Sequence, residues 1–297
     1  MLGGDDWIAA FLREEGLPSV YRASISAVAE PLAQRLQAFC AGRRGPLVVG
    51  MCGAQGSGKS SLTAALRRLM ARRGLRVAVI SLDDLYLTHD QRAALARDVH
   101  PLLAVRGPPG THDIGAGLAL MDDLAQPLEV ALPRFDKGTD DPRPTALWPR
   151  FLGPAHIILL EGWCVGAQAQ PEAQLVQAVN SLEADQDPNG VWRRYVNDAL
   201  AGPYQTLFGQ IDYLILLRAP GFEVVADWRE EQESKLRTLG PVHAARAMSA
   251  DQVRSFVQLY ERLTRHMLDT LPERADLLIE LGPDRTMRLA GPTWRVP

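Results

Sequence analysis

Residues 53–60 of the chain read Gly-Ala-Gln-Gly-Ser-Gly-Lys-Ser. A short apolar stretch, 47–52, comes directly before them, and a segment with helical periodicity, 59–73, follows and is closed by Gly74. Glycines allow successive backbone N–H groups to curl around an anion at the positive end of a helix. The order of strand, glycine-rich loop and helix therefore predicts a phosphate-binding loop and argues against a mere tight turn.

Different residues of this loop are suited to bind different parts of a nucleotide, in the pattern known as a P-loop. Lys59 is placed to reach the β- and γ-phosphates, and Ser60 to put its hydroxyl on Mg²⁺. We therefore predict that the chain binds Mg·ATP and that Lys59 is also catalytic. The predicted nucleotide-binding residues are Gly53, Ala54, Gln55, Gly56, Ser57, Gly58, Lys59, Ser60 and Ser61.

Composition and charge are those of an ordinary globular protein. The 297 residues carry 32 basic and 35 acidic side chains, for a net charge of −3, and 46% of them are apolar. A near-neutral chain has no general attraction to nucleic acid or anionic membranes. The aliphatic runs are too short to span a bilayer, and three scattered cysteines fit a reducing cytoplasm. We expect a cytoplasmic protein with a small-molecule partner, and no nucleic-acid, membrane or obligate protein partner.

Lysine is rare in this chain. Of the 32 basic residues only Lys59, Lys137 and Lys235 are lysine, and the others are arginine. A compact ammonium on a flexible stem differs from the planar guanidinium, so the three lysines are candidates for positions that need the former. The alternative is chance retention on the surface.

Strand and helix patterns alternate along the chain. This alternation predicts an α/β fold with a doubly wound, mostly parallel sheet. We expect a helical N-terminal extension at 1–45 and a P-loop domain at 46–297, with insertions near 100–145 and 165–205 and a lid helix near 222–247. The expected strands are 47–52, 77–82, 128–133, 157–160, 211–217 and 277–281, and the main helices are 59–73, 87–99, 115–125, 222–237 and 249–271.

Acidic residues follow two of the predicted strands. Asp83 and Asp84 come after the second strand, which would place them at the carboxyl edge of the sheet, beside the P-loop strand. A carboxylate there can take the proton of an attacking hydroxyl, and Asp83 is our first candidate. The alternative is that one of the pair caps the next helix. Glu161 ends the run 157–160 and suits the Mg²⁺ environment, or else a capping or core-edge role.

At these residues the sequence resembles the phosphoribulokinase, uridine kinase and pantothenate kinase group. The shared elements are the P-loop, a strand ending in Asp-Asp-x-Tyr and a strand ending in Glu-Gly. Within this group the chain looks most like the plant-type D-glycerate 3-kinases and their fungal kinase-like relatives, over roughly residues 46–285. The segments that carry this closer resemblance are 106–113 (Arg-Gly-Pro-Pro-Gly-Thr-His-Asp), 132–137 (Leu-Pro-Arg-Phe-Asp-Lys), 161–163, 228–229 with Gln232, and 248–249 with 256–257.

The resemblance implies a phosphotransferase with an alcohol acceptor. It would move the γ-phosphate of Mg·ATP to a hydroxyl of D-glycerate or a similar small hydroxy-acid, with Asp83 as base. A small anionic acceptor needs cations and donors for its carboxylate. His112 has a second interpretation as a structural hydrogen-bonding residue, and Arg134 and Lys137 as internal partners of Asp136. The predicted acceptor residues are Asp84, Tyr86, Arg106, His112, Arg134 and Lys137.

The segment 222–237 resembles the lid helix of this group. Its cations, Arg229 first, would close over the phosphates and exclude water. Several glutamates lie on the same helix, so a solvated face is the alternative. Two other functions stay open: a kinase for another metabolite, such as a nucleoside or pantothenate, and a nucleotide-gated switch or metallochaperone-type GTPase. Against the GTPase, the sequence has no Asn-Lys-x-Asp segment and no Cys/His cluster.

Overall fold

The strand that precedes the glycine-rich loop lies at the centre of the sheet. The computed structural model describes residues 6–238 and 248–290. β1 (Leu47–Gly53) is buried along its whole length. It pairs in parallel with β7 (Ile157–Gly162) on one side and with β8 (Tyr213–Arg218) on the other. The P-loop therefore starts from a strand that is held on both edges.

The remaining strands extend this sheet in both directions. β2 (Val77–Ser81) pairs in parallel with β7, and β9 (Leu277–Leu281) pairs in parallel with β8. β10 (Met287–Leu289), which was not predicted, adds an antiparallel edge, so the order is β10-β9-β8-β1-β7-β2. The predicted α/β fold with a mostly parallel sheet is confirmed.

One detail of the predicted order is wrong. The strand that carries Asp83 and Asp84 is not beside the P-loop strand, because β7 lies between them. β7 is buried at every position, whereas β2 is only partly buried at Val79 and Ser81. A strand that is apolar on both faces belongs in the interior of a parallel sheet, and the less apolar strand takes the edge.

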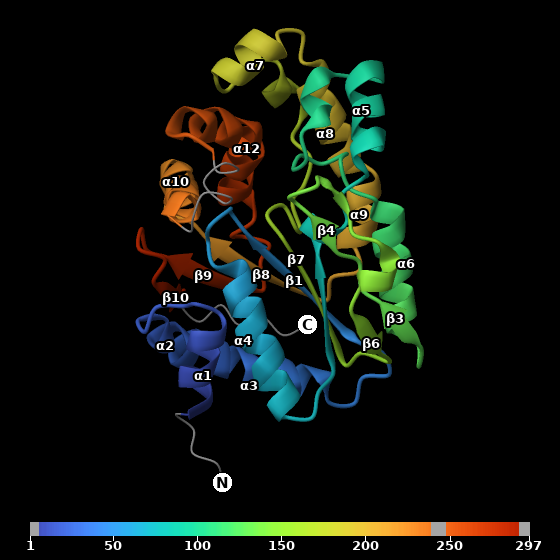
Figure 1. Cartoon of the computed structure of the whole chain (residues 1–297), viewed down its shortest axis with the longest axis vertical. Helices are drawn as coiled ribbons and strands as arrows, with labels where there is room; N and C mark the ends of the chain where they lie inside the picture. Colours follow the sequence, from blue (N-terminus) through green and yellow to red (C-terminus); the bar gives the residue numbers. More distant parts are fainter. Residues whose placement is uncertain (1–5, 239–247, 291–297) are drawn as a thin grey trace.

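The side chains of β1 alternate between two apolar cores, as strand geometry requires. Leu47, Val49 and Met51 pack in the core formed with α4 (Lys59–Arg72) and the N-terminal helices. Val48 packs in the opposite core. Helices thus cover both faces of the sheet (Figure 1). The N-terminal helices are α1 (Asp6–Glu14), α2 (Tyr21–Ser24), a π-helix (Ile25–Ala29) and α3 (Glu30–Cys40).

The second face is covered mainly by helices from the predicted insertions. α6, α8 and α9 contribute to the second core, α10 contributes to the first, and α12 contributes to both. The predicted lid segment, 222–247, is helical as far as Thr238, and residues 239–247 lie outside the described residues. The bounds are α5 (His89–Asp98), α6 (Ile114–Leu124), α7 (Ser181–Gln186), α8 (Val191–Ala201), α9 (Pro203–Phe208), α10 (Glu223–Thr238) and α12 (Ala250–Thr270).

Two small antiparallel pairs lie outside the main sheet. The expected strand at 128–133 forms as β3 (Glu129–Ala131), which pairs with β6 (Arg150–Leu152) rather than with the sheet. β4 (Phe135–Asp136) pairs with β5 (Asp141–Pro142) and forms a tight hairpin. Short 3₁₀ turns at Leu82–Asp84, Pro101–Ala104, Thr145–Leu147 and Glu172–Leu175 connect the elements.

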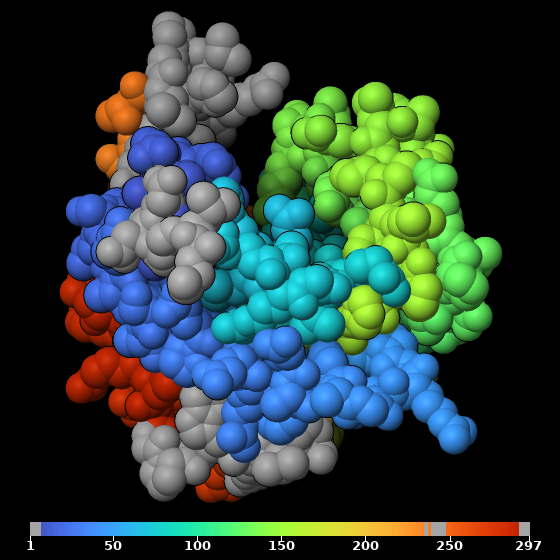
Figure 2. All heavy atoms as spheres, turned by 90° about the horizontal axis from the view of Figure 1, so that it is seen from below, coloured from blue at the N-terminus to red at the C-terminus, as the bar shows by residue number. Residues whose placement is uncertain are grey.

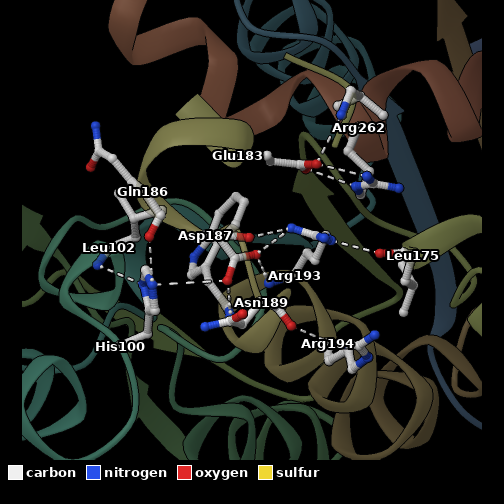
Figure 3. A network of polar contacts seen from close by, with 12 residues as sticks. His100, Leu102, Leu175, Glu183, Gln186, Asp187, Asn189, Arg193, Arg194 and Arg262 are labelled. Carbon is white, nitrogen blue, oxygen red and sulfur yellow. Dashed lines mark hydrogen bonds and ion pairs between the residues drawn. The ribbon is translucent and has the colours of Figure 1, made fainter. Parts of the chain in front are cut away.

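Two buried arginines fix the segment between β7 and α8 (Figure 3). Arg262 on α12 donates to both oxygens of Glu183 at 2.7 and 2.6 Å, and Arg193 donates to Asp187 at 3.0 Å. Both guanidiniums also donate to backbone carbonyls within residues 174–177. Buried ion pairs require such extra hydrogen bonds to offset desolvation. Arg262 and its partners therefore hold this segment against α12.

Candidate active site

The P-loop has the backbone that its sequence predicts. Gly58 is the N-cap of α4 and has φ of 87°, and Gly56 has φ of 76°. Both angles lie in the left-handed region, which favours glycine. A Cβ on Gly56 would also lie 2.8 Å from Cβ of Trp228 on α10. Nζ of Lys59 turns back to the carbonyl of Ala54 at 3.4 Å, so the ammonium stays over the loop.

The metal side of the loop pairs a hydroxyl with a buried carboxylate. Oγ of Ser60 donates to Oε1 of Glu161 at 3.4 Å, and Glu161 is only 8% exposed. Within residues 6–238 and 248–290, Glu161 has no cationic partner. Because a buried and uncompensated carboxylate is costly, this position suits a bound cation. One carboxylate and one hydroxyl fit Mg²⁺, which usually keeps several waters and binds the substrate's phosphates.

A groove leads from solvent to this metal side. It has a volume of about 410 Å³ and runs between α4, the free edge of β2 and the pair β3–β6. Figure 2 shows the hollow between the cyan surface of α4 and β2 and the green surface of residues 130–150. Three arginines, Arg67, Arg134 and Arg150, line it together with Ser60 and Glu161. The groove therefore has three guanidiniums in its wall and adjoins the phosphate loop.

Asp83 is engaged at both carboxylate oxygens. The hydroxyl of Tyr86 donates to Oδ1 at 3.0 Å, and Nζ of Lys137 donates to Oδ2 at 2.6 Å. Burial alone would raise the pKa of Asp83, but the Lys137 ammonium, with help from Lys59 and His112, lowers it to about 2. Asp83 is thus ionised and faces the predicted acceptor cation Lys137, and Tyr86 supports Asp83 from within the core.

Asp84 has different hydrogen-bond and ion-pair partners from Asp83. Its Oδ1 accepts a hydrogen bond from the backbone N–H of Phe135 at 3.0 Å, and its Oδ2 pairs with Arg134 at 3.2 Å. Both partners belong to the chain that leads into the β4–β5 hairpin. Arg134, predicted as an acceptor residue with Asp136 as its alternative partner, thus contacts Asp84. Asp84 therefore positions the hairpin, which in turn presents Lys137.

His112 does not supply the positive charge that was expected of it. The residue is buried, and its ring stacks on Tyr86 with centroids 4.4 Å apart. Burial lowers the pKa of His112 to about 3, so the ring is neutral at physiological pH. The Tyr204 hydroxyl accepts from the N–H of Gly110 and lies 2.5 Å from Nδ1 of His112. The structure therefore agrees with the alternative interpretation of His112 as a structural hydrogen-bonding residue.

Arg106 is also less available than the sequence suggested. Its Nη1 pairs with Oδ1 of Asp140 at 2.5 Å. Asp140 has φ of 58°, and its other oxygen pairs with the buried Arg92 at 2.8 Å. Arg92 also donates to the carbonyl of Asp140. The two arginines therefore fix the turn of the β4–β5 hairpin.

The loop 106–113 is held by two aromatic residues that the sequence did not single out for this role. Nε1 of Trp163 donates to the carbonyl of Gly107 at 2.9 Å. The hydroxyl of Tyr260 on α12 donates to the carbonyl of Arg106 at 3.3 Å. Tyr260 therefore joins α12 to the predicted acceptor loop. Only the fold brings these segments together.

Arg285, which was not predicted to do so, contacts the P-loop from outside, whereas the predicted Arg229 has other partners in the described part of the chain. Arg229 pairs with Glu233 at 2.5 Å and stacks on Phe256, so it lies between α10 and α12 rather than over the loop. Arg285 instead donates to the carbonyl of Gly56 at 2.8 Å and stacks on Trp228.

The chain is similar in sequence to known kinases. A protein of Schizosaccharomyces pombe described as uncharacterized kinase mug58 is 32% identical over 242 residues, which cover 78% of this chain and 84% of that protein. The chain belongs to this family of P-loop kinases. Another relative in the family, the chloroplastic D-glycerate 3-kinase of Arabidopsis thaliana, is 31% identical over 265 residues, or 82% of this chain. The match spans 54% of that plant protein, about half its length.

A solved structure in the kinase family has the same architecture. The D-glycerate 3-kinase from Cryptococcus neoformans var. grubii superposes with a TM-score of 0.71 at 26% identity, covering 88% of this chain and 97% of that one. Residues 20–86 alone also match the family described as methylmalonyl Co-A mutase-associated GTPase MeaB. That match ends before the β4–β5 hairpin. Among the described residues, no helix has the length and apolar character needed to cross a membrane.

Proposed function

We propose that this protein transfers the γ-phosphate of ATP to a hydroxyl of D-glycerate or a similar small hydroxy-acid. The observation that carries the proposal is the contact between Asp83 and Lys137 at 2.6 Å. It places a candidate base and an exposed cation side by side, at the ends of a strand and a hairpin next to the phosphate loop. Two relatives named as D-glycerate 3-kinases support the same acceptor.

Ser60, Glu161 and the P-loop would hold the metal–nucleotide complex. The N–H groups of the loop and Lys59 would bind the phosphates, and Ser60 with Glu161 would provide oxygen ligands on one side. A bound Mg²⁺ would supply positive charge to offset that of the phosphates. The unbalanced carboxylate of Glu161 is the feature of this chain that favours a cation there.

In the transfer step, Asp83 accepts the proton of the acceptor's hydroxyl. The hydroxyl oxygen forms a bond to the γ-phosphorus, the bond from that phosphorus to the β–γ bridging oxygen breaks, and ADP leaves with the electron pair. Lys137 holds the acceptor's carboxylate and thereby fixes which hydroxyl faces the phosphate. Tyr86 keeps the carboxylate of Asp83 oriented through its 3.0 Å hydrogen bond.

The GTPase alternative has a narrower basis. The match to the MeaB family covers only residues 20–86, which contain the strand, loop and helix common to many nucleotide-binding proteins. It leaves out the hairpin that carries Lys137 and the acceptor loop 106–113. The kinase proposal accounts for these segments and the GTPase alternative does not.

An acceptor panel tests the proposal. Purified protein with Mg·ATP is incubated with D-glycerate, L-glycerate, glycerol, a nucleoside, pantothenate or buffer, and ADP and the phosphorylated product are identified by NMR. We expect D-glycerate, or a close hydroxy-acid analogue, to accelerate ADP formation well above buffer with one phosphorylated product. Equal ADP formation with every acceptor and with buffer would overturn the kinase proposal, and selective turnover of a nucleoside would overturn the acceptor class.

A further inference from the structure

The predicted acceptor cation is already paired with the predicted base. Nζ of Lys137 lies 2.6 Å from Oδ2 of Asp83, while Oδ1 accepts from Tyr86. Both oxygens of Asp83 thus have donors before any acceptor is present. A carboxylate that faces an ammonium at this distance is a weak base, because protonating it would leave that ammonium without its counter-charge.

Lys137 is the member of this pair that can move. Its side chain is 57% exposed, and within the described part of the chain Asp83 is its one hydrogen-bond or ion-pair partner. By contrast, the hairpin below it is fixed: Asp84 binds the N–H of Phe135, and the buried Arg92 binds Asp140 at the turn. The ammonium therefore swings on a flexible stem from a rigid support.

The two arginines predicted to bind the acceptor have counter-ions other than Asp83. Arg106 is paired with Asp140, and Arg134 with Asp84. Withdrawing either of these arginines would leave Asp83 unchanged. A carboxylate that takes Lys137 from its present partner releases Asp83 at the same time.

We propose that the ion pair with Lys137 keeps Asp83 from acting as a base in the acceptor-free enzyme, which we call the lock. The carboxylate of the acceptor releases Asp83 by binding the Lys137 ammonium in its place. This inference rests on the proposed kinase function and adds a specificity mechanism to it. A three-carbon hydroxy-acid has its carboxylate and its far hydroxyl at opposite ends of a short chain. One molecule can therefore bind Lys137 and present a hydroxyl to the freed Oδ2 of Asp83.

The lock explains how the site discriminates against neutral hydroxyls. Water and glycerol both carry an O–H that could attack the γ-phosphate, but neither carries a charge that competes for an ammonium. With Lys137 in place, Asp83 does not accept their protons, and ATP is not consumed. Specificity then comes from withholding the base from wrong acceptors as well as from binding the right one.

The test measures ATP consumption with glycerol as the sole acceptor besides water. Wild-type protein is compared with Lys137→Met, which keeps the apolar stem, with Lys137→Gln as a second variant, and with Lys137→Arg, which keeps the charge. The matched control is Arg143→Gln. Arg143 is an exposed cation just after the same hairpin; it pairs with Asp136 at 3.9 Å and does not contact Asp83. Binding of Mg·ATP verifies that each variant is folded.

We expect Lys137→Met and Lys137→Gln to raise this consumption at least about tenfold, since a freed general base contributes on the order of 10²–10⁴ to rate. Arg143→Gln should stay at the wild-type rate, Lys137→Arg, which keeps a cation beside Asp83, should gain less than Lys137→Met, and adding Asp83→Asn to Lys137→Met should abolish the gain. A role for Lys137 in binding alone predicts no gain, so an unchanged or lower rate overturns the lock. A gain that survives Asp83→Asn overturns it as well.

These outcomes are independent of D-glycerate itself. Wild-type turnover with D-glycerate is measured in parallel, and its absence would count against the proposed function. The effect of Lys137→Met on neutral acceptors is read from the same protein without D-glycerate. Failure of the acceptor assignment and failure of the lock are therefore distinguishable.

Discussion

Asp84 accepts a hydrogen bond from the backbone N–H of Phe135 at 3.0 Å and so ties the end of β2 to the hairpin that carries Lys137. Its neighbour Asp83 faces Lys137 itself. Two adjacent and chemically identical residues therefore have separate tasks. Asp84 fixes the support, and Asp83 is the group that would accept the proton.

This division predicts unequal effects of the same substitution. Asp83→Asn should lower kcat about 10²–10⁴-fold, because an amide cannot act as a general base, while Mg·ATP binding is retained. Asp84→Asn keeps an oxygen for the N–H of Phe135 and should reduce kcat far less. Steady-state kinetics and nucleotide titration check both. Equal losses in the two variants would contradict the separate roles.

Arg285 should matter for nucleotide affinity although it is remote from the P-loop in sequence. Its hydrogen bond to the carbonyl of Gly56 orders the loop, so Arg285→Met should weaken Mg·ATP binding about tenfold, the effect of losing one charge-assisted hydrogen bond. Arg288→Met on β10 is the control, since that side chain is 81% exposed and its nearest acidic partner is 3.8 Å away. Calorimetric titration compares the two, and equal affinities would refute the role of Arg285.

The buried pair of Arg262 and Glu183 should dominate the stability of the region in Figure 3. Arg262→Met leaves the Glu183 carboxylate buried without its cation, and we expect the free energy of unfolding to fall by about 3–5 kcal/mol. Replacing both residues, as Arg262→Met with Glu183→Leu, should recover much of this loss. Arg265→Met, an exposed ion pair on the same helix, should cost at most about 1 kcal/mol. Urea unfolding measures all three.

His112 should make the protein less stable in mild acid. Its folded-state pKa of about 3 is lower than the ordinary value of 6.5, so the unfolded chain binds a proton first as pH falls. The contribution of neutral His112 to the free energy of unfolding is therefore fully present above about pH 6.5, and it is lost as the pH falls from there towards 3. The ionised groups and polar rings that face His112 are Asp83, Tyr86 and Tyr204.

The measurement compares unfolding free energies at pH 7 and pH 5 in wild type and in His112→Gln. One proton over this interval accounts for roughly 2 kcal/mol, so the variant should show a pH dependence smaller by about that amount. Asp83 does not interfere, because its folded and ordinary pKa values of about 2 and 3.8 both lie below this window. The same pH dependence in both proteins would show that His112 is not the titrating group.

Some features of this protein follow from its sequence because they depend on neighbours in the chain. The glycines at 56 and 58, the lysine after them and the strand and helix on either side specify the P-loop locally. Alternating apolar patterns specify the helical layers and the mostly parallel sheet, and Ser249, a residue type that favours N-caps, caps α12 through an equally local hydrogen bond. Each of these signals lies within a few turns of chain, where propensity and periodicity act.

The tertiary structure alone decided which predicted residues meet. Lys137 and Asp83 are 54 residues apart, and Gly56 and Arg285 are 229 apart. Burial made His112 neutral, an ion pair with Asp140, 34 residues away, engages Arg106, and Arg229 stacks on Phe256 of a different helix. The pairing of a charge depends on which counter-ion the fold brings near and how much water it removes, and neither quantity is encoded in local sequence. The local sequence at 53–60 thus specifies the phosphate-binding loop, and the tertiary structure determines that Lys137 is the cation that contacts Asp83.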